Sequence, residues 1–209
     1  MPNIQKYMRL FTGSGEVGSD NPLSVSVADA IVAGEEHIGT VGGHVVTPTA
    51  VLIRPANTTA YASGDLVANS ATAAAVLPLV FANAVRKVGG SGKVRRARLT
   101  KNSDDVTNPT FRLHVFTSNP VSVVPTNGDN DAIQLTGARN SHVGSFEFDM
   151  TANDIHTDGN FDDAVPLVGQ ELNFTIASGT SLFGLLEARA AYTPASEERF
   201  VATLEIQQD

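Results

Sequence analysis

The sequence predicts an all-β protein, an antiparallel β-sandwich or jelly roll preceded by an extended N-terminal arm. Short stretches rich in Val, Thr, Phe and Leu alternate apolar with polar residues, as half-buried strands do. Gly, Pro and Asn separate these stretches at short intervals. Only residues 71–84 have a helical composition, and Pro78 in their middle argues against a helix. Seven to nine short strands with turns between them are typical of a sandwich.

The strand pattern begins at residue 44, so we divide the chain into an arm, residues 1–43, and a sandwich domain, residues 44–209. Within the domain we expect an edge or bulged strand around Pro48, because proline has no N–H to donate to a sheet. A turn is expected at Ser63-Gly64-Asp65. The other expected strands cover residues 93–100, 110–117, 145–150, 172–177, 181–190 and 199–207.

The arm is rich in glycine and contains one strand-like stretch. Leu23, Val25 and Val27 alternate with small residues, a pattern that suits a strand added to another sheet. At roughly 3.3 Å per residue, 43 residues extend to at most about 140 Å, far enough to reach a neighbouring subunit. An arm that folds back on its own domain is an equal alternative.

Composition excludes several classes of protein. The chain has 209 residues and no cysteine, which removes disulfides, thiolate metal sites and cysteine nucleophiles. No run of about 20 apolar residues exists, and the N-terminus lacks the apolar core of a signal peptide. We therefore expect no membrane span, and a protein of the cytoplasm or of a particle made there.

No motif indicates catalysis. The G-x-G-x-x-G pattern at residues 13–18 is followed by turn residues instead of a helix, so it predicts a flexible arm. The Gly-rich stretch ending at Lys93 fails as a phosphate loop, because Lys87 and Val94 stand where Gly and Ser or Thr are required. No G-x-S-x-G elbow occurs. We predict a non-enzymatic protein without a cofactor.

Calcium is a weaker alternative that the acidic stretch leaves open. Residues 127–163 carry eight Asp and Glu against one Arg. Calcium takes six to eight oxygen ligands, yet the ligand spacing of an EF-hand is absent here. Carboxylates in polar loops are usually solvated or cap turns.

The basic segment from residue 81 to residue 120 is the most informative part of the chain. It holds eight of the 14 Lys and Arg in a protein of net charge −8. Strict strand alternation places Lys93 and Arg95 on one face and Arg96 and Arg98 on the other. A strand charged on both faces belongs at a sheet edge or an interface. We therefore predict these four residues, with Leu23, Val25 and Val27 of the arm, to form assembly contacts.

An acidic protein surface is the partner that this strand favours. The candidates are residues 127–163 of a neighbouring copy or another protein. Direct nucleic-acid binding is not expected, because no aromatic stacking platform accompanies the strand and the net charge opposes polyanion binding.

Several segments together resemble a family of small all-β structural proteins of tailed bacteriophages and prophages, the capsid decoration or cement proteins. The resemblance spans roughly residues 45–209 and rests on the order and spacing of six segments. They are residues 46–50 (VTPTA), 60–68 (AYASGDLVA), 81–100 (FANAVRKVGGSGKVRRARLT), 114–120 (HVFTSNP), 176–194 (IASGTSLFGLLEARAAYTP) and 200–209 (FVATLEIQQD). The arm before His44 and the density of Arg in residues 93–98 depart from the family.

The resemblance implies a virion protein that sits on the outside of the capsid lattice as a trimer, bound to the major capsid protein. It would reinforce the shell against internal DNA pressure through many small contacts. A tail or head-fibre component is the structural alternative. A carbohydrate-binding or adhesion module is the alternative from another class, although the chain has no Trp and only three Tyr to form a sugar platform.

Overall fold

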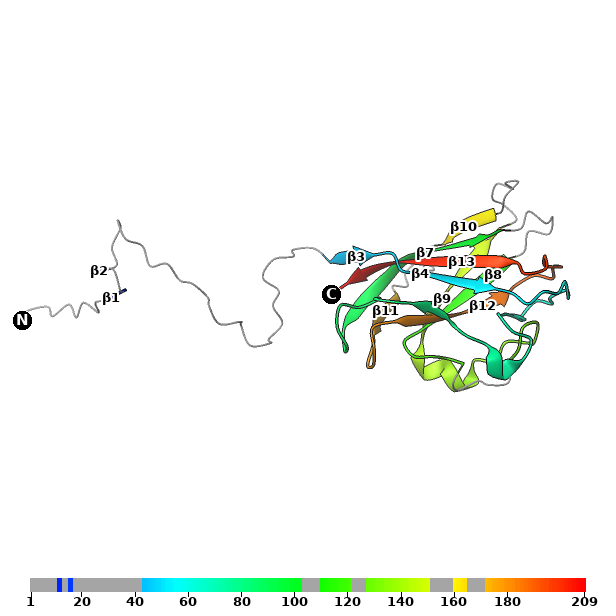
Figure 1. Cartoon of the computed structure of the whole chain (residues 1–209), viewed down its shortest axis with the longest axis horizontal. Helices are drawn as coiled ribbons and strands as arrows, with labels where there is room; N and C mark the ends of the chain where they lie inside the picture. The colour runs from blue at the N-terminus through cyan, green and yellow to red at the C-terminus, as the bar shows by residue number, and fades with distance from the viewer. Residues whose placement is uncertain are drawn as a thin grey trace, which may run out of the picture. The chain divides into compact units, whose positions relative to one another are not determined.

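The computed structural model describes residues 43–102, 110–121, 127–150 and 172–209 with their side chains, and the backbone of three further strands at 11–12, 15–16 and 160–164. The chain divides into two compact units, Met1–Val41 and Gly42–Asp209. In the first unit, β1 (Phe11–Thr12) pairs antiparallel with β2 (Gly15–Glu16). The second unit is a sandwich of two antiparallel sheets, which confirms the predicted fold class (Figure 1).

The first sheet has six strands with the longest two at its centre. β7 (Ser91–Lys101) pairs with β13 (Arg199–Gln208), whose other side pairs with β3 (His44–Val46) and β4 (Thr49–Ile53). β10 (Asn160–Ala164) and β11 (Leu172–Thr175) lie in succession along the other side of β7. Pro48 separates β3 from β4 at the sheet edge, as its missing N–H predicts.

The second sheet has five strands. Its order is β5 (Leu66–Val67), β12 (Leu182–Ala188), β8 (Thr110–Phe116) and β9 (His142–Asp149), with β6 (Leu79–Phe81) also paired to β12. Two 3-10 helices, η1 (Ala73–Ala75) and η2 (Thr136–Ser141), lie in its connections. The single turn of η1 is all the helix that residues 71–84 form, and Pro78 precedes β6.

The main core lies between the sheets and follows the alternation of their strands. Every second residue of β13, Phe200 to Ile206, is buried. From the facing sheet, Phe111 of β8 meets the ring of Phe200 edge to face, with centroids 5.1 Å apart. The apolar residues that the sequence assigned to one face of each strand therefore form one continuous core.

A second, smaller core covers part of the outer face of the five-stranded sheet. It contains Phe116, Leu66, Val76, Ala138 and Leu185. Strand alternation alone predicts that His114 and Phe116 face away from the main core, and both do, yet both are buried. The segments that carry η1 and η2 supply apolar residues over this face, which a period-two pattern within β8 does not reveal.

Two buried ion pairs are joined to tyrosines of the main core, Tyr61 and Tyr192. Arg54 Nη2 is 2.9 Å from Asp129 Oδ2, and Lys101 Nζ is 3.2 Å from Glu198 Oε1. Tyr61 donates to Asp129, Tyr192 to Glu198, and the two tyrosine rings stack. Burial raises the pKa of Glu198, and the charge of Lys101 offsets part of that rise. These hydrogen bonds satisfy the buried charges, as burial requires.

Candidate assembly surface

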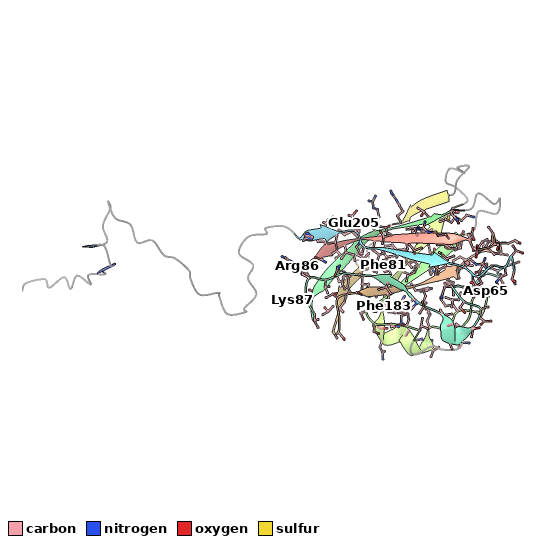
Figure 2. The ribbon with its side chains drawn as sticks, viewed as in Figure 1. Asp65, Phe81, Arg86, Lys87, Phe183 and Glu205 are labelled. Atoms are coloured by element: carbon pink, nitrogen blue, oxygen red, sulfur yellow. The ribbon has the colours of Figure 1, made fainter. Side chains whose placement is uncertain are left out.

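The outer face of the six-stranded sheet carries the four cations that the sequence predicts as assembly contacts. On β7, Arg95, Arg96 and Arg98 are exposed and Lys93 is half-buried, whereas Val94, Ala97 and Leu99 point into the core. Figure 2 shows Glu205 of the neighbouring β13 on the opposite side of the sandwich from Phe183 of β12. The four cations therefore share one face, and the prediction of two charged faces is wrong.

A β-bulge is the physical reason for this correction. The pairing of β7 with β13 passes from Glu205–Arg96 to Ile206–Val94, so Arg95 is an extra residue with no partner of its own. An extra residue reverses the alternation beyond it. Lys93 consequently faces outward with Arg96 and Arg98, although strict alternation would put it on the other face. Nothing in the local sequence, which lacks Gly and Pro at this point, marks the bulge.

Of the two positions predicted for this strand, a sheet edge or an interface, the sheet edge is wrong. β7 is paired on both sides over most of its length, with β13 on one side and β10 and β11 on the other. Its backbone therefore has no open edge for a partner along these stretches. A partner can contact these stretches of β7 only through the side chains on its outer face.

Within the same chain, the basic face already has acidic and polar neighbours. Arg96 is 3.2 Å from Glu205, and Arg95 donates to Gln207 over 3.3 Å. β10 places Asp163 in register with Arg98. The acidic stretch, residues 127–163, was expected to contact this basic strand from another copy. Within the same chain it already contributes β10, which pairs with β7.

The other cations of the basic segment lie elsewhere. Arg86 and Lys87 are in the loop before β7, at the end of the sandwich away from Asp65 (Figure 2). Lys101 is buried with Glu198, and Arg112 lies on the second sheet with Glu147. The charge that is concentrated in the sequence is therefore divided between two sheets, a loop and the interior.

The outer face of the six-stranded sheet also has an apolar region. Val51 and Ile53 of β4 are 49% and 51% exposed. Val51 stands in register with Val201 of β13, which in turn pairs with Thr100 of β7. The face therefore combines an ionic row at Arg96–Glu205 with an apolar row at Val51–Val201.

A charged network on the second sheet was not predicted. Strand register places Arg112 of β8 between Glu187 of β12 and Glu147 of β9. His114 Nε2 lies 2.9 Å from Glu187 Oε2, and Arg189 Nη1 lies 3.0 Å from Glu187 Oε1. Burial by itself would raise the pKa of Glu187, but its hydrogen bonds with His114 and Arg189 and their charges lower it overall. Because these residues come from three separate strands, only the sheet register could have identified the network.

His142 joins this network beside His114. Their facing ring nitrogens are 3.4 Å apart, and the His142 ring also packs near Phe116. Partial burial lowers the pKa of His142, and the neighbouring His114 lowers it further.

No group of three or more His, Asp or Glu among the side chains that the structure describes could hold a metal ion. Asp129 of the acidic stretch forms a buried ion pair with Arg54.

The remaining predicted contacts, Leu23, Val25 and Val27, lie outside the described residues. So do residues 154–158 of the acidic stretch. No helix of the described residues is long and apolar enough to cross a membrane.

Solved structures of other proteins resemble this chain, but no family is shown for it. No family model and no curated protein matches the chain. A chain of the cyanophage Pam1 capsid asymmetric unit is similar at 16% identity and a TM-score of 0.35, covering 89% of this chain and 99% of that one. Desmodium yellow mottle tymovirus gives 10% identity and a TM-score of 0.24, covering 89% of this chain and 95% of that one. Israeli acute paralysis virus gives 14% identity and a TM-score of 0.29, with 96% and 78% covered.

Proposed function

We propose that this chain is a structural protein of a virus particle, a cement protein that binds the outside of a capsid lattice and stabilises it. The observation that carries the proposal is the outer face of the six-stranded sheet. It presents the ionic row and the apolar row on one sheet face, separated by the Thr49–Thr203–Arg98 row. The sequence resemblance to phage decoration proteins supports the same role.

The proposed stabilisation depends on many weak contacts that are repeated over the capsid lattice. An exposed ion pair contributes between about 0 and 1 kcal/mol, so one such face binds weakly. A lattice presents the same partner many times, and a molecule that contacts two or three subunits binds all of them with an effective concentration that far exceeds the free one. Holding neighbouring capsid subunits together in this way raises the cost of opening the shell. A homotrimer on the major capsid protein is the arrangement we propose.

Charge reversal on the basic face tests the proposal. Arg95→Glu, Arg96→Glu and Arg98→Glu together remove three cations that would face the capsid. If each contact contributes about 0.5 kcal/mol, binding to particles stripped of this protein weakens about tenfold. Co-sedimentation with the stripped particles measures the loss.

A matched control separates local contacts from overall charge. Arg86→Glu, Lys87→Glu and Arg139→Glu change the net charge by the same amount at sites away from the sheet face. The control should bind particles as the unchanged protein does. Equal binding by both triple variants, or binding of the unchanged protein to DNA but to no particle, would contradict the proposal.

A further inference from the structure

The open edge of the six-stranded sheet is formed by β4. This strand pairs with β13 on one side, and no strand of the described residues pairs with its other side. Arg54 N–H donates to Glu198, and the Pro48 carbonyl accepts from Leu204 N–H, so both groups point toward β13. Since alternate residues of a strand direct their N–H and C=O to the same side, Val51 and Ile53 direct theirs to the open side.

This edge lacks the features that usually prevent pairing. Exposed edges are commonly protected by charged residues or by proline. Residues 49–53 (TAVLI) carry no charge, and prolines stand only at the margins, at Pro48 and Pro55. Val51 and Ile53 are about half exposed. The edge is therefore a template for one further strand of about five residues.

A groove beside this edge defines what the added strand must look like. It encloses about 310 Å³ between β4 and the β6 segment and is lined there by Leu77, Pro78 and Val80. Leu77 is 68% exposed and Val80 is 45% exposed, so apolar surface is open to water. A strand added to β4 places every second side chain over the groove. Those side chains should be apolar, and the ones between them small.

We propose that this edge receives residues 23–27 of a second copy of the chain. Leu23, Val25 and Val27 supply three apolar side chains at alternate positions, and Ser24 and Ser26 between them are small. Strand addition gives the affinity through backbone hydrogen bonds and the specificity through alternate side chains. The inference deepens the proposed function, because it names how copies of the protein join each other on a lattice.

The chain between residues 23–27 and β3 is long enough to reach a second copy. Residues 28–43 separate the segment from β3, and at roughly 3.3 Å each they span at most about 50 Å. β3 pairs with residues 206–208 and β4 with residues 199–203, so the chain enters the edge at one end and runs along it. A span of this length lets residues 23–27 reach the β4 edge of a second copy, and the cross-linking below distinguishes that copy from the same one.

Disulfide trapping in solution tests the proposal, and the absence of cysteine from the chain makes it specific. With Leu23, Val25 and Val27 over the groove, Ser24 and Ser26 face outward, on the same side of the sheet as Val51 and Ile53. Full-length double variants pair Ser24→Cys or Ser26→Cys with Val51→Cys or Ile53→Cys, so that all four combinations cover the alternative registers. Paired strands bring Cα atoms to about 4.5–5.5 Å, a separation that a disulfide spans.

We expect at least one combination to give covalently linked oligomers under mild oxidation, seen as dimers and larger species on a non-reducing denaturing gel. Single-cysteine variants identify dimers that form by collision. The matched control pairs the same arm cysteine with Val88→Cys, because Val88 is a more exposed valine outside the groove. It should give no more than the collision background.

A proline variant supplies the second measurement. Val25→Pro removes a backbone donor from the added strand, and it should abolish linking in the best cysteine pair. Ala33→Pro, in the same arm outside the segment, should leave linking intact. Thermal unfolding of each variant checks that the domain is folded.

Two results overturn the proposal. Linking confined to monomers, which migrate faster on the gel, would mean that the arm covers its own β4. Linking no greater than in the Val88→Cys control for all four pairs would mean that residues 23–27 do not bind this edge. The same experiments separate this proposal from the proposed function. Linked oligomers that bind no particle would contradict only the capsid role. Unlinked protein that still binds particles would contradict only the strand exchange.

Discussion

At the scale of single residues, the ionisable groups on the second sheet tie stability to pH. His142 has a lowered pKa in the folded chain, so the unfolded chain binds more protons as the pH falls through the ordinary histidine value of about 6.5. The pKa of Glu187 is also lowered, and its contribution is lost at still lower pH, below the ordinary glutamate value of about 4.3. Both groups make the folded protein less stable in acid.

We predict that the contribution of His142 to the free energy of unfolding is lost from pH 7 to pH 5 and that of Glu187 toward pH 4, whereas the raised pKa of Glu198 acts in the opposite direction. His142→Gln removes the group with the lowered pKa and should flatten the curve between pH 7 and pH 5. His44→Gln is the control, because His44 is an exposed residue of β3 outside the network. Urea unfolding at each pH gives the measurement, and identical pH profiles for both variants would contradict this account of His142.

At the scale of elements, the bulge in β7 decides which residues form the candidate surface. Arg95 is the extra residue, so the strand without it would still place Val94 and Ala97 inward and Lys93, Arg96 and Arg98 outward. On its other side, β7 changes partner here, from β11 at Val94 to β10 at Ala97. Arg95 is therefore paired with neither β13 nor the strands on the other side of β7, so an extra residue is accommodated there.

We predict that deletion of Arg95 is tolerated and deletion of Arg98 is not. Removing Arg95 leaves a regular strand, whereas removing Arg98 shifts one half of the strand by a residue and turns buried side chains such as Leu99 to the outer face. The two deletions remove the same residue type from the same strand three positions apart. The midpoint of thermal unfolding should decrease far more for the second, and equal decreases would contradict the assigned bulge.

The same element shows where prediction from sequence succeeds and where it ends. Period-two patterns correctly indicate the strands and inward faces of β8, β9 and β13, because burial between two sheets imposes that period. They give wrong faces for β7, because a bulge adds a residue without changing the composition. They also miss the Arg112–Glu147–Glu187 row, because it depends on which strands are neighbours in space, whereas Pro48 did indicate the edge at β3 and β4.

At the scale of the whole molecule, the proposed role requires the sandwich to hold its outer face rigid while it binds other proteins. The buried pair Arg54–Asp129 joins the residue after β4 to the loop at Asp129, and the buried pair Lys101–Glu198 joins the end of β7 to the segment before β13. Such pairs are costly to break, because the charge that remains is buried without its partner. The outer face can therefore bind neighbours through exposed residues that the core does not need.

The most direct measurement is the heat resistance of virus particles with and without this protein. Purified particles should contain it, stripping should lower the temperature at which they release DNA, and adding the protein back should restore that temperature. The Arg95→Glu, Arg96→Glu, Arg98→Glu variant should restore less than the matched control. Particles that lack the protein, or that resist heat equally well after it is stripped, would contradict the account.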